Sequence, residues 1–197
     1  MDAQILNEQS LDLIFRDAHT ASFFQEKPLP ESLLHQVYDL AKFGPTSANC
    51  GPARFRFLIS KEAKERLRPT LDEGNVAKTM IAPVTVIVAY DLAFYDQLPH
   101  LFPQADARSW YAGKTAFIQE TAFRNGTLQG AYFIIAARAL GLDCGPMSGF
   151  KNKQVDEIFF QNSTLCSNFL INLGYADKSK FYPRNPRLNF DEACQIL

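Results

Sequence analysis

The sequence predicts one α+β domain over residues 1–197, in which layers of helices cover a mixed sheet. A chain of 197 residues that is 47% hydrophobic and 21% charged is long and apolar enough to bury one sizeable core. Long helical patterns alternate with a few strand patterns along the whole chain. No repeat, low-complexity run or linker divides it, so we expect a single domain.

The first half should contain three helices and one strand. Apolar residues in 3–15 recur at roughly helical spacing. Residues 28–44 predict a stronger helix, because Pro30 suits its first turn and Gly44-Pro45 ends it. RFRFLIS alternates like a strand, and KEAKERLR predicts a short charged helix that ends at Pro69.

The second half begins with VTVIVAY, residues 84–90, whose continuous β-branched run is typical of a buried central strand. Residues 91–114 are aromatic and loop-like. A long helix should follow over residues 114–140, with Gly141 as its C-cap. We then expect a Gly/Pro-rich loop in DCGPMSGF, a helix in NKQVDEIFF, a strand in NFLINLGYA, and a basic loop with a short helix at the end.

Charge and hydropathy argue against several kinds of partner. The net charge of -1 and pI near 6.3 give no electrostatic footprint for nucleic acid or an anionic membrane. MDAQILNEQSLDLIF lacks the basic start and apolar run of a signal peptide, and AYFIIAARALGL is too short to span a bilayer. The 17 phenylalanines instead predict a large aromatic core, or an apolar surface that a partner covers.

The cysteines predict neither a metal site nor disulfides. The four are Cys50, Cys144, Cys166 and Cys194; no two form CxxC, and no nearby histidines complete a zinc pattern. We therefore expect free thiols in a reducing cytoplasm and no bound metal.

Two loops share one design, PTSAN at 45–49 and GPMSGF at 145–150. Glycine and proline tighten both, and the first offers the polar side chains of Thr46, Ser47 and Asn49. Such loops let backbone N–H groups approach the edge of a flat heterocycle. The alternative is that both only end a helix.

Two further pairs of polar residues are candidates for binding an anionic ligand. Asn75 and Lys78 lie three apart and would face the same way on a helix, where the lysine could hold an anionic or electron-rich group. Arg184 and Arg187 flank Asn185-Pro186, and two arginines in a stiff loop suit a phosphate. For each pair the alternative is an ordinary solvated surface.

Other catalytic signatures are missing from the sequence. GxSxG, the P-loop and the Rossmann GxGxxG are all absent. His19, His35 and His100 are scattered, and nothing in their spacing indicates a catalytic triad.

Taken together, these motifs resemble the nitroreductase family of FMN-dependent oxidoreductases. PTSAN resembles its Pro-Ser-Ser-x-Asn loop, and Asn75 with Lys78 its Asn-x-x-Lys. PMSGF resembles its Pro-x-Glu-Gly-Phe loop, with Ser148 in place of glutamate, and Arg187-Leu188 its C-terminal Arg-Leu phosphate site. The runs GPTSANCGPAR, DARSW, ETAFRN and LGLDCGPMSGF are similar to the malonic semialdehyde reductase branch, which is linked to pyrimidine degradation.

The resemblance implies an α-β-α sandwich and an intertwined homodimer with two FMN molecules at the subunit interface. Burial between subunits would also account for the phenylalanine content. Carried over residue by residue, it implies that the cofactor is bound by His19, Thr20, Pro45, Thr46, Ser47, Asn49, Asn75, Lys78, Pro146, Met147, Ser148, Gly149, Arg184 and Arg187.

Besides Ser148, the sequence departs from the family at two further positions. The arginine that usually binds the FMN phosphate falls, counting back from Phe24 and Pro28, on Ala18. Arg16, His19 and Arg184 are the candidates to replace it. An aromatic residue that often follows the first loop is also missing, since Ala53 stands there.

The implied reaction passes electrons from NADH or NADPH through flavin N5 to a second substrate, with Lys78 as an electrostatic tuner and no side chain assigned as acid or base. We expect a small 3-oxoacid such as malonic semialdehyde as acceptor. Arg54 or Arg108 would bind its carboxylate and Trp110 would cover the flavin, unless both arginines pair with acidic residues such as Asp106. The alternatives are a broad nitroaromatic or quinone reductase and a flavin-binding protein without turnover.

Overall fold

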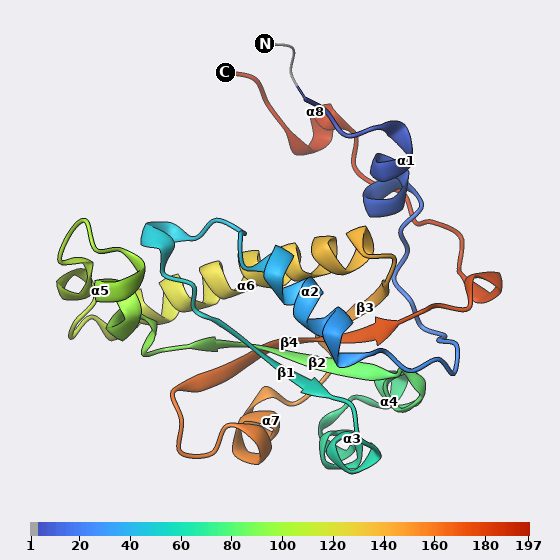
Figure 1. The fold of residues 1–197 in the computed structure, drawn as a ribbon, viewed down its shortest axis with the longest axis horizontal. Helices are drawn as coiled ribbons and strands as arrows, with labels where there is room; N and C mark the ends of the chain where they lie inside the picture. Colours follow the sequence, from blue (N-terminus) through green and yellow to red (C-terminus); the bar gives the residue numbers. More distant parts are fainter. Residues whose placement is uncertain (1–3) are drawn as a thin grey trace.

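The computed structural model describes residues 4–197, in which four antiparallel strands lie between two layers of helices (Figure 1). The sheet has the order β1-β2-β4-β3. Its strands are β1 (Ala53–Leu58), β2 (Val84–Asp91), β3 (Asp143–Met147) and β4 (Leu165–Gly174). The expected α-β-α sandwich is therefore present.

The direction of the strands differs from the expected mixed sheet. All three pairings between the named strands are antiparallel. Within residues 4–197, the parallel contact is an isolated bridge that joins Cys144 of β3 to Thr20, which lies outside the named strands. The long connections from β1 to β2 and from β3 to β4 each carry helices, as parallel crossovers do, so the sequence pattern alone did not separate the two cases.

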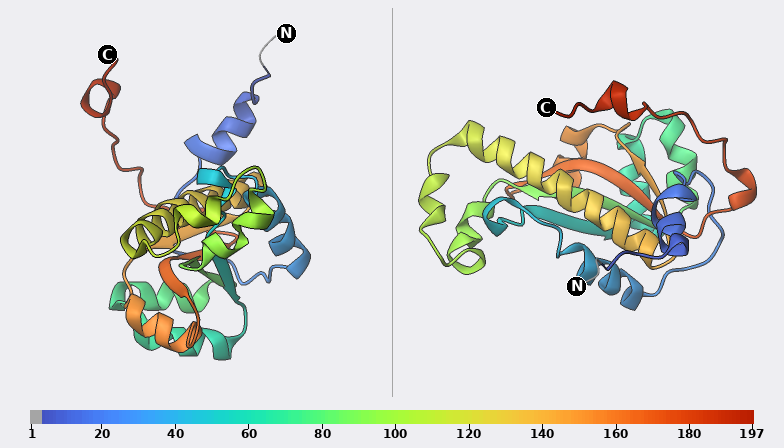
Figure 2. Two further views of the ribbon diagram at one scale, coloured as in Figure 1. Left: turned by 90° about the vertical axis from the view of Figure 1, so that its left-hand side faces the viewer. Right: turned by 90° about the horizontal axis from the view of Figure 1, so that it is seen from above.

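Helices cover both faces of the sheet. α2 and α6 lie on one face, and α3, α4 and α7 lie on the other (Figures 1 and 2). The α-helices are α1 (Glu8–Leu11), α2 (Glu31–Ala41), α3 (Lys61–Leu67), α4 (Glu73–Ile81), α5 (Leu98–Leu101), α6 (Thr115–Ala139), α7 (Asn152–Phe159) and α8 (Phe190–Ala193). The other helical segments are the π-helical η1 (Asp12–Arg16) and the 3-10 helices η2 (Ser47–Asn49), η3 (Arg68–Thr70), η4 (Phe94–Gln97), η5 (Ala107–Trp110) and η6 (Lys178–Lys180).

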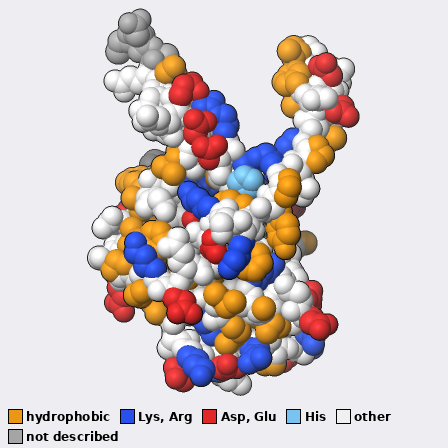
Figure 3. All heavy atoms as spheres, turned by 90° about the vertical axis from the view of Figure 1, so that its right-hand side faces the viewer, with side chains coloured by type: hydrophobic (Ala, Val, Ile, Leu, Met, Phe, Trp, Pro, Cys, Tyr) orange, Lys and Arg blue, Asp and Glu red, His pale blue; other side chains and the backbone are white. Residues whose placement is uncertain are grey.

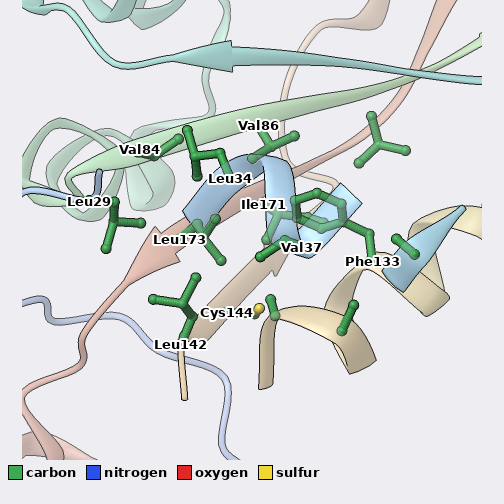
Figure 4. Packing of buried hydrophobic residues seen from close by; sticks show 14 residues of the cluster. Leu29, Leu34, Val37, Val84, Val86, Phe133, Leu142, Cys144, Ile171 and Leu173 are labelled. Atoms are coloured by element: carbon green, nitrogen blue, oxygen red, sulfur yellow. The ribbon is translucent and has the colours of Figure 1, made fainter. Parts of the chain in front are cut away.

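Strand β2 supplies both halves of the core. Val84, Val86 and Val88 face α2 and α6, where they pack with Phe133 (Figure 4). Ile87 belongs to the cluster on the opposite face, under α3 and α7. All of residues 84–90 are buried, which confirms the predicted central strand.

Two of the predicted segments need correction. The Gly/Pro-rich stretch from Asp143 was expected to be a loop, but Asp143–Met147 forms the edge strand β3. An edge strand tolerates Pro146 because the missing N–H costs no ladder hydrogen bond there. The N-terminal helix is shorter than the expected 3–15 and begins at Glu8; residue 3 lies outside the described residues.

Both ends of the described chain extend from the body as arms (Figures 1 and 2). The N-terminal arm contains α1 and the C-terminal arm contains α8. Both expose large apolar side chains, namely Ile5, Leu6, Leu13 and Phe15 in the first and Tyr182, Leu188, Phe190, Ile196 and Leu197 in the second.

None of the helices between residue 4 and residue 197 combines the length and the apolar character that a membrane-spanning helix requires.

Candidate functional site

The first predicted loop is held in a rare backbone conformation. Ala48, Asn49 and Gly51 have positive φ angles of 49°, 50° and 43°. Residues other than glycine adopt such angles at a cost, which the surrounding contacts must offset. Thr46 Oγ1 accepts a hydrogen bond from the Gly51 N–H at 3.1 Å, and Asn49 Nδ2 donates to the Leu101 carbonyl at 2.8 Å. The predicted polar side chains therefore shape the loop.

Helix α6 supplies support for this loop that the sequence reading missed. The side chain of Asn125, only 3% exposed, accepts from the Ser47 N–H at 2.8 Å and donates to the Thr121 carbonyl at 2.9 Å. Gln129 Oε1 accepts from the Ala53 N–H at 2.8 Å. Two amide side chains one helical turn apart in a long helix were the available signal.

The second predicted cluster forms between α4 and the segment after β3. Asn75 Nδ2 donates to the Gly149 carbonyl at 2.7 Å, and the Asp72 N–H donates to the same oxygen at 3.0 Å. Lys78, one turn further along α4, is half-buried. The predicted pair Asn75 and Lys78 and the predicted Ser148-Gly149 segment are thus neighbours in space, with Ser148 exposed.

A series of buried hydrogen bonds connects this cluster to the sheet. Thr85 Oγ1 donates to Asn172 Oδ1 at 2.9 Å, and Asn172 Nδ2 donates to Thr79 Oγ1 at 3.2 Å. Thr79 Oγ1 in turn lies 3.6 Å from Met147 Sδ. The three polar residues are fully buried, so the chain ties α4 to the end of β3 at a fixed register.

A basic hollow of about 320 Å³ lies where the two arms join the body. Figure 3 shows basic side chains and a histidine gathered at the base of the arms. The hollow brings together the predicted His19, Thr20, Arg184 and Arg187 and adds Arg138, which was not predicted. Its donor set suits an anion with several acceptor oxygens, such as a phosphate.

The backbone at Ala18, where the family arginine is missing, is contacted by Arg184. Arg184 Nη2 donates to the Arg16 carbonyl at 2.5 Å and to the Ala18 carbonyl at 2.8 Å. His19 stacks on Phe181 with ring centroids 4.9 Å apart. Arg16 is engaged elsewhere, since its guanidinium pairs with Asp12 and Glu8 and these contacts raise its pKa.

Strand β3 runs between the hollow and the α4 cluster. Thr20 of the hollow bridges to Cys144, and the Ala21 N–H donates to the Cys144 carbonyl at 2.9 Å. A Cβ on Gly145 would lie 2.3 Å from the Ala21 carbonyl oxygen, so only glycine admits this approach. The predicted residues that follow are Pro146, Met147, Ser148 and Gly149.

The predicted substrate arginines each have a carboxylate partner. Arg54 Nη2 lies 3.0 Å from Asp91 Oδ2, and its Nη1 donates to two backbone carbonyls. Arg108 Nε lies 2.9 Å from Asp96 Oδ1. Trp110 belongs to the same short turn as Arg108 and is 44% exposed. The sequence suggested Asp106 as an acidic partner for these arginines, whereas the structure pairs Arg54 with Asp91 and Arg108 with Asp96.

Within one chain, the residues predicted to bind the cofactor therefore lie in two separate regions. The loop at 45–49 packs near α5 at one end of the sheet, while the hollow and the α4 cluster lie toward the other end (Figure 1). No hydrogen bond within residues 4–197 joins the loop to Gly149 or to the hollow. The same range contains no group of three or more His, Cys, Asp or Glu placed to hold a metal ion.

Comparison with known proteins gives consistent matches over most of the chain. A model described as "Nitroreductase family" matches residues 16–175. A protein of Burkholderia lata with the provisional name NADH dehydrogenase/NAD(P)H nitroreductase is 59% identical over 191 residues, which is 97% of this chain and 98% of the relative. A protein of Stenotrophomonas maltophilia with the same provisional name is 57% identical, covering 97% of both chains.

Solved structures agree on the fold. A nitroreductase-type structure from Bacillus subtilis has a TM-score of 0.85 at 19% identity, covering 97% of this chain and 100% of its own. One from Exiguobacterium sibiricum, solved in complex with FMN, has a TM-score of 0.85 at 18% identity, covering 98% and 99%. At such identity, the likeness shows the shared fold alone. With the family model and the 59% identical relative, it follows that the chain belongs to the nitroreductase family.

Proposed function

We propose that the protein is an FMN-dependent oxidoreductase that uses NADH or NADPH. The observation that carries the proposal is the course of β3, which links a basic hollow to the contact between Asn75 and Gly149. From Cys144 to Met147 the strand advances about 10 Å, at roughly 3.3 Å a residue. A phosphate at one end and the polar edge of a flat ring at the other would match this arrangement.

The residues divide into three roles. His19, Thr20, Arg184 and Arg187 would bind the phosphate, since they line the hollow. The segment Pro146, Met147, Ser148 and Gly149 would pass along the ring with Asn75, and Lys78 would place a positive charge near its electron-rich edge. When bound, FMN supplies the transfer of a hydride from the nicotinamide to a second substrate.

We propose that a second copy of the chain completes the site. Pro45, Thr46, Ser47 and Asn49 lie away from the hollow in one chain, so a partner's loop is needed to bring them to the ring. Both arms expose apolar side chains that a partner would cover, as in an intertwined homodimer. The provisional names of the relatives and the FMN bound in the Exiguobacterium sibiricum structure support the cofactor and the nicotinamide donor of this proposal.

For the acceptor we propose a small 3-oxoacid such as malonic semialdehyde, reduced to the 3-hydroxyacid as in pyrimidine degradation. The support is the run of motifs shared with that branch and the position of Arg108 beside Trp110 in one exposed turn. Arg54 remains the second candidate for the carboxylate, although Asp91 and two carbonyls already engage it. The four unpaired thiols fit a reducing compartment, so we propose a cytoplasmic location.

The decisive experiment combines flavin analysis with turnover. Purified protein should be yellow and should release FMN, and not FAD, on denaturation. It should then be assayed with both nicotinamides against malonic semialdehyde, a quinone and a nitroaromatic compound. Colourless protein that FMN cannot reconstitute would contradict the cofactor, and FMN without oxidation of either nicotinamide would favour a flavin-binding protein. Reduction of quinones alone would favour the broad reductase.

The substrate arginine is tested by comparing two acceptors in Arg108→Ala and Arg54→Ala. Loss of a carboxylate contact should lower kcat/KM for malonic semialdehyde roughly tenfold to hundredfold. The uncharged quinone should be much less affected. Equal losses on both acceptors in both variants would show that neither arginine binds the carboxylate.

A further inference from the structure

We infer that Arg138, at the C-terminal end of α6, binds the phosphate of the cofactor and takes the place of the missing N-terminal arginine. The inference rests on the proposed function and adds to it a residue that neither the motifs nor the family resemblance assigned.

Arg138 reaches the basic hollow from a different element than the other cations. His19 and Thr20 come from the segment after η1, and Arg184 and Arg187 come from the C-terminal arm. Arg138 instead projects from the last turn of the long helix that packs against the sheet. Of the three arginines that line this hollow, Arg138 is therefore the one that belongs to a helix packed against the sheet.

Its side chain keeps donors available for a ligand. A guanidinium has five N–H donors, and one nitrogen of Arg138, Nη1, donates to the Ile14 carbonyl at 3.1 Å. That bond fixes the side chain beside η1 without neutralising it. None of the ion pairs found within residues 4–197 includes Arg138.

Two of the three acidic residues near Arg138 have other partners. Asp12, Asp17 and Asp143 line a neighbouring hollow that Arg138 also borders. Asp12 pairs with Arg16, and Asp143 Oδ2 accepts from the Ala176 N–H at 2.8 Å. Arg138 thus borders two hollows, one that contains Asp12, Asp17 and Asp143 and one whose lining contains no acidic residue.

The chemistry of the ligand explains why a third arginine is useful. A phosphate monoester carries about −1.5 to −2 charges at neutral pH and three strong acceptor oxygens. Arg184 uses one terminal nitrogen on two backbone carbonyls, and Arg187 uses one on the Asn185 and Pro186 carbonyls. Arg138 adds a forked donor from a rigid helix, in the geometry that phosphate oxygens prefer.

The test compares FMN with riboflavin, which is the same flavin without the phosphate. Full-length protein freed of flavin by dialysis is titrated with each ligand, as wild type, Arg138→Gln and Arg138→Lys. We expect Arg138→Gln to weaken FMN about tenfold to a hundredfold, as for the loss of a charged hydrogen bond, and Arg138→Lys to weaken it less. Riboflavin affinity should stay within about threefold in both variants.

Arg68→Gln is the matched control, because Arg68 is exposed and pairs with Glu65 at 3.4 Å, outside the hollow. It should leave both affinities unchanged. Equal weakening of FMN and riboflavin by Arg138→Gln, or no weakening of either, would overturn the inference while leaving the proposed function intact. If wild-type protein binds neither flavin, the proposed function itself fails. Arg138→Lys keeps the charge and stem, so it remains informative if Arg138→Gln does not fold.

Discussion

At the level of single residues, Gly149 has no room for a side chain. A Cβ there would lie 2.4 Å from Asn75 Nδ2 and 2.8 Å from Asp72 Oδ2. We expect Gly149→Ala to separate α4 from the end of β3, to lower the free energy of unfolding by roughly 1–3 kcal/mol, and to reduce FMN occupancy. Urea unfolding and the flavin-to-protein ratio measure the two effects.

Gly74 provides the control, because it lies on α4, the helix that Gly149 contacts. A Cβ there meets nothing within 4 Å, and the backbone is helical. Alanine is the better helix former by up to about 1 kcal/mol, so Gly74→Ala should leave FMN bound and stability equal or higher. Similar behaviour of the two variants would show that the close approach at Gly149 does not matter.

Lys78 presents a different test at this scale, because it concerns the flavin and not the fold. It is half-buried beside Asn75, where its charge would stabilise the reduced, more negative flavin. Losing one charge-assisted contact is worth roughly 1.5–3 kcal/mol. For two electrons that corresponds to about 30–65 mV, so the flavin midpoint potential should be lower in Lys78→Met. An unchanged potential at full FMN occupancy would refute the role.

At the level of elements, α3 is joined to α4 through a buried amine. Lys64 of α3 is only 5% exposed, and its Nζ donates to the Ala82 carbonyl at the end of α4. Burial lowers the pKa of Lys64 from 10.5 to about 8. Between these values the unfolded chain binds more protons than the folded one. The free energy of unfolding should therefore rise with pH from about 8 to 10.5 through this residue.

The rise in the free energy of unfolding must be measured as a difference between wild type and a Lys64 variant. Buried thiols, which both proteins contain, lower the free energy of unfolding as the pH rises. Burial raises the pKa of Cys50 from 9.0 to about 11 and that of Cys144 to about 12, so both cost stability above about pH 9. We expect wild type to gain roughly 1–3 kcal/mol relative to Lys64→Met between pH 8 and 10.5 in urea unfolding. A constant difference across that range would mean that Lys64 titrates normally.

The elements that the sequence predicted well are those whose residue pattern and packing agree. β2 begins with five β-branched residues and lies between two strands, and α2 carries one apolar face. β3 was missed because Gly145 and Pro146 have low strand propensity, whereas pairing with β4 and the approach of Ala21 decide its structure. The antiparallel direction of the strands was missed because it depends on which strands become neighbours in the sheet, and the sequence pattern does not specify this.

Part of the arrangement of the candidate site was also predictable from the sequence. Asn75 and Gly149 were found by motif and do meet. Arg138 was passed over because it interrupts an apolar helix, and its neighbours in the hollow come from segments far away in the sequence. Asn125 was overlooked because the amide pair that it forms with Gln129 in the helix does not identify the distant loop that the two residues support.

At the level of the whole molecule, the described chain leaves much apolar surface open. Besides the two arms, α6 exposes Phe117, Phe123, Leu128 and Tyr132 along its length. Phe123 and Leu128 line an apolar hollow of about 470 Å³ with Thr127 and Ala131. Exposed apolar side chains in this number on one helix indicate an interaction surface.

We therefore expect the 22.2 kDa chain to form a dimer, and we expect variants that cannot dimerise to lose FMN as well. Phe123→Glu should place a charge in the interface, shift sedimentation toward the monomer at micromolar concentration, and release FMN. Ile81→Glu is the control, because Ile81 is 52% exposed against 50% for Phe123 but lies on α4, across the sheet from α6. It should keep both properties. A wild-type monomer that retains FMN would refute the shared site, since one chain would then bind the flavin without the partner's loop.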